Sequence, residues 1–342
     1  MDDPGQLPRL VEQLRHSLGI QQKQDIQLAA QYFRPRTRSL ESLSGLSGGL
    51  ERSADPPVLL GDDCAAIWQG DRHLLFAAEG MLPSLVEAEP WFAGWCAVMV
   101  NVSDIYAMGG HPIAIVDALW SPSPAASHEL WTGLQAAAAA YGIPVVGGHT
   151  NCHSPYAALS VAILGQAQQL ITSFHAQAGD VLLMAIDLRG QPFKHYPFWN
   201  AATTTDPQRL RDDLSLLPLL AEQGWCDAGK DISMGGVLGT ALMLLETSQC
   251  GAVIDLEAIP RPPSLDVYPW LHHFPSYGFL LSVRPHQVER IQAQFRGRDL
   301  HCEAIGRVDD SQQLTLTWGA ETAMLWNLAE QPLTGWAPSG DR

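Results

Sequence analysis

Four carboxylates in the first third of this sequence lie in contexts that favour cation binding. Asp62 and Asp63 follow a glycine after a short apolar segment, Glu79 precedes a glycine at the end of a predicted strand, and Asp104 lies in a long apolar segment. Adjacent acids repel each other unless a cation or a donor-rich loop neutralises them, and a lone carboxylate on an apolar helix is costly to bury. These positions indicate a metal site, although turn chemistry and solvation near a helix end are alternative explanations.

A histidine motif, Gly147-Gly148-His149-Thr150, follows a predicted strand over residues 143–146. Paired glycines let the backbone approach a ligand closely, and the imidazole and hydroxyl would then lie at the carboxyl end of that strand. Because a single histidine is more often structural, a site role and a structural role are both open for His149.

Two other stretches have the composition of anion-binding segments. Ser233, Gly235 and Gly236 precede a predicted helix, whose first N–H groups favour anions. The Gly/Ser-rich stretch 42–50 could cradle phosphates through its backbone N–H groups. It has no Walker spacing and no lysine, however, and such segments are equally often mobile linkers.

One predicted helix positions the central acid. It begins near Pro90, and Gly109 ends it before Pro112. Asn101 and Asp104 are three residues apart on one face of this helix and can therefore act at one spot. The buried face, at the spacing of an apolar helical stripe, is formed by Trp95, Val98, Met99, Val102 and Ile105.

The bulk composition predicts a two-domain protein because 342 residues exceed one typical core. A formal net charge of -16 argues against nucleic acid or an acidic membrane surface as a partner. The 6 cysteines form no CxxC pair, and the sequence shows no secretory signal and no apolar stretch of roughly 18 residues. We therefore expect reduced thiols, a cytoplasmic location and no membrane partner.

Five motifs, in order, resemble the aminoimidazole ribonucleotide synthetase superfamily over roughly residues 55–310. They are Gly-Asp-Asp-Cys-Ala-Ala from residue 61, Asn-Val-Ser-Asp-Ile-Tyr-Ala-Met-Gly-Gly-His-Pro from residue 101, Val-Gly-Gly-His-Thr from residue 146, Gln-Ala-Gly-Asp-Val-Leu-Leu from residue 177 and Lys-Asp-Ile-Ser-Met-Gly-Gly-Val-Leu from residue 230. Each motif alone is weak, whereas five in sequence are specific.

The resemblance implies an α+β or α/β fold in which an N-terminal sheet domain dimerises and a C-terminal α/β domain follows. ATP would lie in a cleft between them, with its phosphates held by Mg²⁺ on aspartates. The expected extents are N-terminal helices and a Gly/Ser-rich loop over 1–54, an ATP-binding domain over 55–170, a synthetase-like domain over 171–330 and a tail over 331–342.

The resemblance also implies roles for individual residues. The implied catalytic residues are Asp104, Asp231 and His149. The implied metal ligands are Asp62, Asp63, Glu79, Asp104 and Asp231. The implied nucleotide contacts are Asn101, Gly147, Gly148, Thr150, Ser233, Gly235 and Gly236.

The chain departs from the branches of this superfamily that it most resembles. Thiamine-monophosphate kinases carry aspartates in place of Glu79 and His149 and a second acid in place of Met234, and the cysteines that other branches use as nucleophiles are missing. The sequence therefore predicts an ATP- and Mg²⁺-dependent kinase- or ligase-type enzyme, a homodimer, acting on an oxygen of a small substrate. The alternative is a nucleotide- or phosphometabolite-binding protein of the same fold that has lost catalysis.

Overall fold

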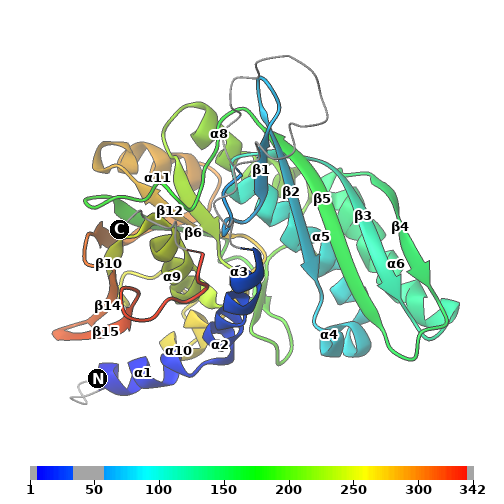
Figure 1. Cartoon of the computed structure of the whole chain (residues 1–342), viewed down its shortest axis with the longest axis horizontal. Coiled ribbons are helices and arrows are strands. Elements are labelled where there is room, and N and C mark those ends of the chain that lie inside the picture. Colours follow the sequence, from blue (N-terminus) through cyan, green and yellow to red (C-terminus); the bar gives the residue numbers. More distant parts are fainter. Residues whose placement is uncertain (1–5, 34–57, 337–342) are drawn as a thin grey trace.

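The computed structural model describes residues 6–33 and 58–336. Within these ranges the chain forms two α+β halves that lie side by side, each built around a mixed sheet (Figure 1). No helix in this described part is long and apolar enough to cross a membrane.

The first sheet has five strands in the order β1-β2-β5-β3-β4. β3 and β4 are parallel, and the other neighbours are antiparallel. Because side chains alternate along a strand, one face packs against helices and the other faces outward, where Phe76, Val116 and Leu164 are exposed. The strands are β1 Ala65–Trp68, β2 His73–Gly80, β3 His111–Trp120, β4 Val145–Asn151 and β5 Ala158–Ala167.

Three helices cover the inner face of this sheet: α4 Pro83–Ala88, α5 Pro90–Ala107 and α6 Pro124–Tyr141. The predicted long helix is confirmed as α5, which is buried from Phe92 to its end and is followed by Gly109 at φ 72°. α5 and α6 meet backbone to backbone, since a Cβ on Gly94 would lie 2.1 Å from the carbonyl oxygen of Leu130. A Cβ on Gly133 would likewise lie 1.9 Å from the carbonyl oxygen of Trp91.

The second sheet has seven strands in the order β15-β14-β10-β13-β6-β12-β9. Its interior strand β6 is buried at every position, as its continuous apolar sequence predicts. The strands are β6 Val181–Ile186, β9 Ala228–Asp231, β10 Gly251–Asp255, β12 Gly278–Val283, β13 His301–Asp309, β14 Gln313–Trp318 and β15 Glu321–Asn327. The helices of this half are α7 Pro207–Leu214, α8 Leu216–Glu222, α9 Gly236–Ser248, α10 Val267–Leu271 and α11 Val288–Arg296, with the short 3-10 helix η2 Pro285–Gln287.

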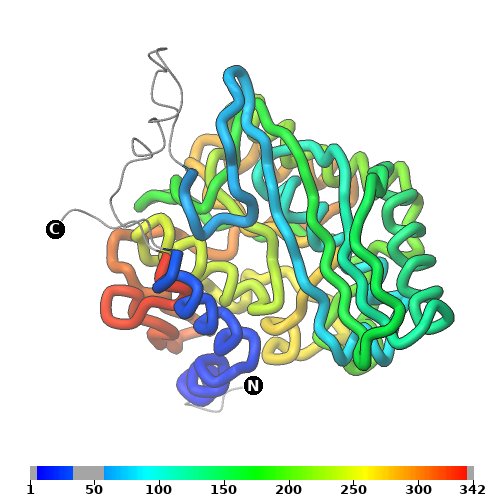
Figure 2. The backbone as a smooth tube through the Cα atoms, turned by 45° about the vertical axis from the view of Figure 1, so that its right-hand side comes forward, coloured from blue at the N-terminus to red at the C-terminus, as the bar shows by residue number. Residues whose placement is uncertain are grey.

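A small third sheet and three N-terminal helices complete the fold. The sheet pairs β7 Gln191–Pro192, β8 Phe198–Asn200 and β11 Phe274–Pro275. The helices are α1 Gln6–Arg15, α2 Leu18–Gln24 and α3 Ile26–Phe33. They run beneath the second half (blue in Figures 1 and 2), where Arg15 donates hydrogen bonds to the carbonyl oxygens of Met324 and Leu325 at 2.8 and 2.9 Å.

The fold differs from three expectations. Apolar positions that include Leu10, Leu14 and Leu18 predict one or two amphipathic helices over residues 1–33, but residues 6–33 form three helices and Leu18 is 67% exposed. The strand expected over 143–146 is β4, which continues through the Gly-Gly-His-Thr motif. The sequence of residues 303–308 and 314–318 predicts a closing hairpin, and this prediction is wrong because β10 lies between β13 and β14 and pairs with both. The Gly/Ser-rich stretch 42–50 lies outside the described residues.

Candidate functional site

Asp62 and Asp63 are neutralised within the chain by Lys230. The Lys230 ammonium is buried, donates to Asp63 and lies 3.7 Å from Oδ1 of Asp62. The N–H of Ser173 donates to Asp62 Oδ2 at 2.9 Å, and the N–H of Asp231 donates to Asp63 Oδ2 at 3.3 Å. A cation and backbone donors, the partners that adjacent acids need, are therefore both present.

The same burial controls the charge states of this group. Burial raises the pKa of Asp62 to about 6. Burial alone would lower the pKa of Lys230, but the negative charges of Asp63 and Asp62 outweigh that effect and raise it. Lys230 therefore stays protonated beside the two acids.

Asp104 and Asp231 come from different halves and meet at the junction, where α5 contacts β9. Both side chains are buried, and Oδ2 of Asp104 has no hydrogen-bond partner among the described residues. Burial and the charge of Asp231 raise the pKa of Asp104 well above its usual value. Burial and the charge of Asp63 raise the pKa of Asp231 to about 8. Near neutral pH both carboxyls favour the protonated form unless a cation compensates them.

Lys23 and Glu79 complete the group around these acids. Lys23 lies on α2 and Glu79 at the end of β2, and both line the same cavity as Asp104 and Asp231. Burial lowers the pKa of Lys23, an effect that the charge of Asp231 opposes. The N-terminal helices thus bring a lysine to the acids of the two halves.

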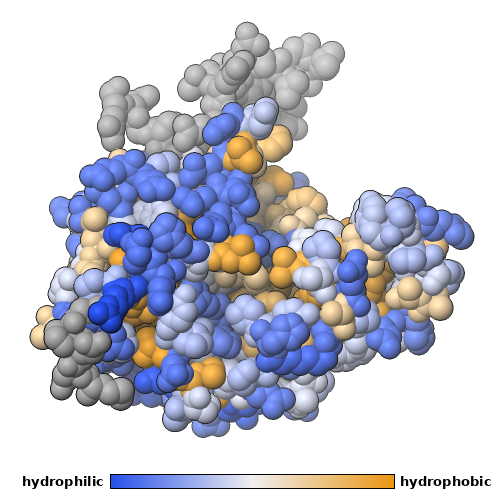
Figure 3. Space-filling model, turned by 90° about the horizontal axis from the view of Figure 1, so that it is seen from below, coloured by the Kyte–Doolittle hydropathy of each residue, from blue (hydrophilic) through white to orange (hydrophobic). Residues whose placement is uncertain are grey.

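The cavity that these residues share has a volume of about 140 Å³. Seen from below, apolar side chains gather in the middle of the molecule between more hydrophilic surfaces (Figure 3). The apolar part of the cavity wall is formed by Leu85, Phe92, Trp95, Met99, Val100, Phe198 and Phe274. The acids therefore lie at one side of a mostly apolar space.

The donor set fits Mg²⁺ in part. Carboxylate oxygens are the hard ligands that this ion prefers, and the unpaired Oδ2 of Asp104 is free to accept a cation. No three acidic, histidine or cysteine side chains in residues 6–33 and 58–336 already surround one point. Since Mg²⁺ is often held by one or two carboxylates together with phosphates and water, the arrangement suits an ion that arrives with a nucleotide.

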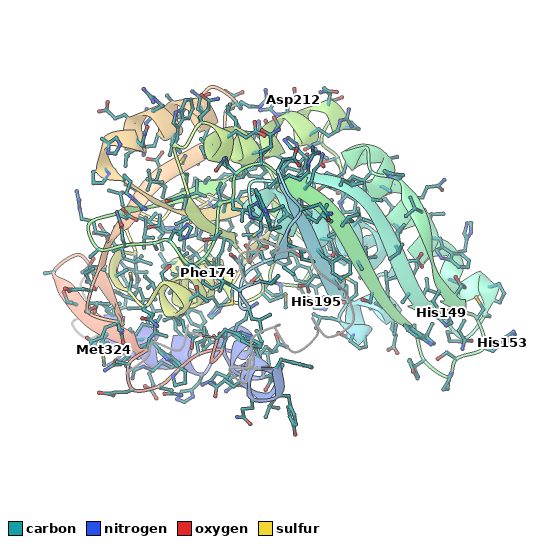
Figure 4. The ribbon with its side chains drawn as sticks, turned by 45° about the horizontal axis from the view of Figure 1, so that its top comes forward. His149, His153, Phe174, His195, Asp212 and Met324 are labelled. Atoms are coloured by element: carbon teal, nitrogen blue, oxygen red, sulfur yellow. The ribbon has the colours of Figure 1, made fainter. Side chains whose placement is uncertain are left out.

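The structure does not bring the histidine motif to this cavity within one chain. His149 is exposed on β4, the edge strand, 5.6 Å from the ring of Trp120, and Figure 4 shows it at the outer end of the first sheet beside His153. Gly148 is explained by packing, because a Cβ there would lie 2.3 Å from Oδ1 of Asp117. The site roles of Gly147, Gly148, His149 and Thr150 therefore stay predictions without support from a single chain.

The start of α9 is more closed than the sequence suggested. Gly235 and Gly236 are buried, and a Cβ on Gly236 would lie 1.9 Å from the carbonyl oxygen of Leu271. On the other side, a Cβ on Gly19 of α2 would lie 2.5 Å from the carbonyl oxygen of Met234. Close packing accounts for these glycines, and their role in nucleotide binding stays a prediction.

Two further predicted contacts differ in position. Ser233 lines the cavity, and its hydroxyl has no hydrogen-bond partner among the described residues. Asn101 is fully buried, donates to the carbonyl oxygen of Ala97 at 2.8 Å and does not line the cavity. Asn101 and Asp104 share α5, but only Asp104 reaches the space where a ligand could bind.

Sequence reasoning missed both lysines, and for the aromatic residues of segment 187–213, which include Phe198, it left open whether they stack on a ligand ring or simply pack. Lys230 precedes Asp231 in a recognised motif, and a lysine inside a buried strand is itself a signal of an acidic partner. Lys23 gave a weaker signal, because a lysine on a partly polar helix is usually solvated. Nothing local to the sequence indicates that Phe92, Phe198 and Phe274 line one cavity, since that arrangement depends on the tertiary fold.

Two family models match the chain. The model of the AIR synthase related protein N-terminal domain matches residues 61–167, and that of the C-terminal domain matches residues 177–319. An uncharacterized protein of Synechocystis sp. is 53% identical over 330 residues, which are 96% of this chain and 98% of that protein. A thiamine-monophosphate kinase of Synechococcus elongatus is 31% identical over 236 residues, 62% of this chain and 71% of that enzyme.

Among solved structures, Thermotoga maritima PurL complexed with ATP superposes with a TM-score of 0.70 at 19% identity. The match covers 84% of this chain and 48% of that one, and it shows likeness of fold. The resemblance inferred from the five motifs is thus confirmed. The chain belongs to the AIR synthase-related family, and its two halves carry the N-terminal and C-terminal domains of that family.

Proposed function

We propose that this chain is an ATP- and Mg²⁺-dependent enzyme that transfers phosphate to an oxygen of a small metabolite, either as product or as an activated intermediate. The observation that supports this most is the meeting of Asp104 and Asp231, from different halves, at one cavity. A thiamine-monophosphate kinase among its relatives and an ATP complex with its fold support the same reading.

Each residue of the group has a role in this proposal. Mg²⁺, held by Asp104 and Asp231 with help from Glu79, would neutralise the phosphates of ATP. Lys23 adds positive charge at the same cavity, and Lys230 holds Asp62 and Asp63 in place. Phosphoryl transfer needs positioning and charge neutralisation rather than a covalent protein group, and these side chains supply both.

The test is Mg²⁺-dependent nucleotide binding and hydrolysis by the parent and by Asp104→Asn. Binding is measured by titration calorimetry with ATP, with and without Mg²⁺, and hydrolysis by phosphate release. Because loss of a residue that only orients a metal ligand typically costs about 10–100-fold in metal affinity, loss of the ligand Asp104 itself should weaken Mg²⁺-dependent ATP binding by at least about tenfold. Asp310→Asn removes an exposed acid far from the cavity and serves as the matched control. Equal Mg²⁺-ATP binding by the parent and Asp104→Asn would sink the proposal.

A noncatalytic nucleotide-binding protein is the second candidate. One observation in its favour is that Lys230 already forms ion pairs with Asp62 and Asp63. Another is that Met234 and His149 lie at positions where thiamine-monophosphate kinases have acids. Mg²⁺-dependent ATP binding without phosphate release, across a panel of small hydroxyl compounds, would select this candidate over the enzyme.

A further inference from the structure

The cavity beside the acids has walls that suit a flat ring. Phe92 stacks on Phe193 with 3.5 Å between ring centroids, and Phe198 stacks on Tyr196 at 5.4 Å with an interplanar angle of 2°. Phe274 meets Phe198 edge to face at 84°. The aromatic side chains of this wall are thus held in fixed orientations by one another, and an inserted ring could adopt the offset-stacked or edge-to-face geometries that aromatic pairs prefer.

The size of the cavity limits what it can hold. Its volume of about 140 Å³ is close to that of an engineered apolar cavity of about 150 Å³ that binds benzene. One aromatic ring with a short substituent therefore fits, whereas a fused ring system with a sugar attached does not fit without rearrangement.

Buried polar atoms without partners give the cavity specificity. Trp95 lines it, is 5% exposed and has an indole N–H with no acceptor among the described residues. The Ser233 hydroxyl and Oδ2 of Asp104 are also unpaired there. Because an unpaired buried polar group is unfavourable, a ligand that supplies an acceptor for Trp95 and a hydroxyl near Asp104 would be favoured over a hydrocarbon.

The lining of the cavity offers an anion few favourable partners. Its lining includes three acids, Glu79, Asp104 and Asp231, and one cation, Lys23. Lys230, the nearest other lysine, is held by Asp63 and Asp62. Among the described residues that line the cavity there is no arginine, the side chain best suited to hold a phosphate in two hydrogen bonds.

We propose that the acceptor is a small molecule with one aromatic or heteroaromatic ring, neutral or cationic, that carries no phosphate before the reaction. This rests on the proposed function. The hydroxyl oxygen of the acceptor forms a bond to the γ-phosphorus of ATP, the bond from that phosphorus to its bridging oxygen breaks, ADP leaves, and the hydroxyl proton is released to water. The class differs from the phosphorylated acceptor named in thiamine-monophosphate kinase.

The test uses three ring compounds of different charge, without ATP or Mg²⁺, so that its outcome is independent of nucleotide binding. Ligand-observed NMR measures binding of benzyl alcohol, benzylamine and phenyl phosphate to the full-length protein. We expect dissociation constants on the order of 1 mM for the neutral and cationic compounds, as for other very small ligands. Phenyl phosphate should bind at least about tenfold more weakly, because the lining offers its phosphate one lysine and no arginine.

Two variants tie this binding to the cavity. Met99→Trp fills the cavity and should abolish binding of benzyl alcohol, and the same substitution at the exposed Met324 (Figure 4) should leave it unchanged. Phe274→Leu removes one ring from a half-buried position and should weaken benzyl alcohol at least about threefold, so the inference stays testable if Met99→Trp fails to fold.

Three results would overturn the inference. Binding of phenyl phosphate as tight as that of benzyl alcohol would show that the cavity accepts anions. Unchanged binding in folded Met99→Trp, or in Phe274→Leu, shows that the ring binds elsewhere. Displacement of benzyl alcohol by ATP without Mg²⁺ shows that the cavity is the adenine site. None of these results affects the Mg²⁺-ATP test of the proposed function.

Discussion

Protons on Asp104 and Asp231 make the stability of this protein depend on pH. The pKa of Asp231 is about 8 in the fold, mainly because of burial, and about 4 in an unfolded chain. Between these values the folded state binds more protons than the unfolded state, so the free energy of unfolding falls as the pH rises. The raised pKa of Asp104 acts in the same direction.

Thermal unfolding should therefore show a falling melting temperature as the pH is raised from about 5 to about 8. Asp231→Asn cannot ionise and should reduce this fall by several degrees, since about 1 kcal/mol corresponds to roughly 2–4 °C in a protein of this size class. Asp310→Asn should keep the slope of the parent. An Asp231→Asn slope equal to that of the parent would contradict the assignment.

Lys230 should be far more important for stability than an ordinary lysine. Lys230→Met leaves Asp62 and Asp63 buried without their cation and should lower the free energy of unfolding by about 3–5 kcal/mol. Lys194, which pairs with Glu89 at the surface, provides the control. Lys194→Met should change the free energy of unfolding by at most about 1 kcal/mol. Urea denaturation measures both. A small effect of Lys230→Met would mean that the acids are solvated or protonated.

Among the secondary-structure elements, the glycine contact between α5 and α6 fixes where Asp104 lies. A Cβ on Gly133 would stand 1.9 Å from a backbone oxygen of α5, which cannot move without shifting the helix. Gly133→Ala should therefore destabilise the protein by about 1–3 kcal/mol and weaken Mg²⁺-ATP binding. Gly147→Ala meets nothing within 4 Å and should leave the stability unchanged. Urea denaturation and calorimetry of both variants provide the measurement, and equal stability of the two would be evidence against the close contact.

Sequence reasoning succeeded where the signal is local. Apolar periodicity predicted α5, and the motif resemblance predicted that Asp104 and Asp231 lie together, as they do at the cavity. It failed where tertiary contacts decide, since β10 separates the two strands expected to form a hairpin. The site role of His149 stays a prediction, because β4 holds this residue away from the cavity within one chain. Lys23 is brought to the acids by the docking of α2 against α9, which no pattern within α2 predicts.

For the whole molecule, the outer face of the first sheet is the surface most suited to a second copy of the chain. Phe76, Val116 and Leu164 are 51%, 39% and 36% exposed on this face, and exposed apolar patches commonly mark interaction sites. We propose that the chain forms a homodimer through this face, as the sequence analysis expected.

A charge placed on that face should disrupt such a dimer. Phe76→Glu is expected to halve the mass measured by light scattering after size-exclusion chromatography, because a carboxylate buried between two sheets would lack a partner. Met324→Glu places the same charge on an exposed apolar residue of the second sheet and should leave the mass unchanged. A parent protein that elutes as a monomer, or a dimeric Phe76→Glu, would refute this mode of association.

The buried ion pairs of Lys230 with Asp62 and Asp63 connect the two family domains. If the chain is divided between residues 167 and 177, one fragment contains Asp62 and Asp63 without their cation, and the other contains Lys230 without its acids. Each fragment would therefore expose charged groups whose ion-pair partners lie on the other fragment. We expect the two co-expressed fragments to bind each other, and we expect added salt to lower the affinity between them.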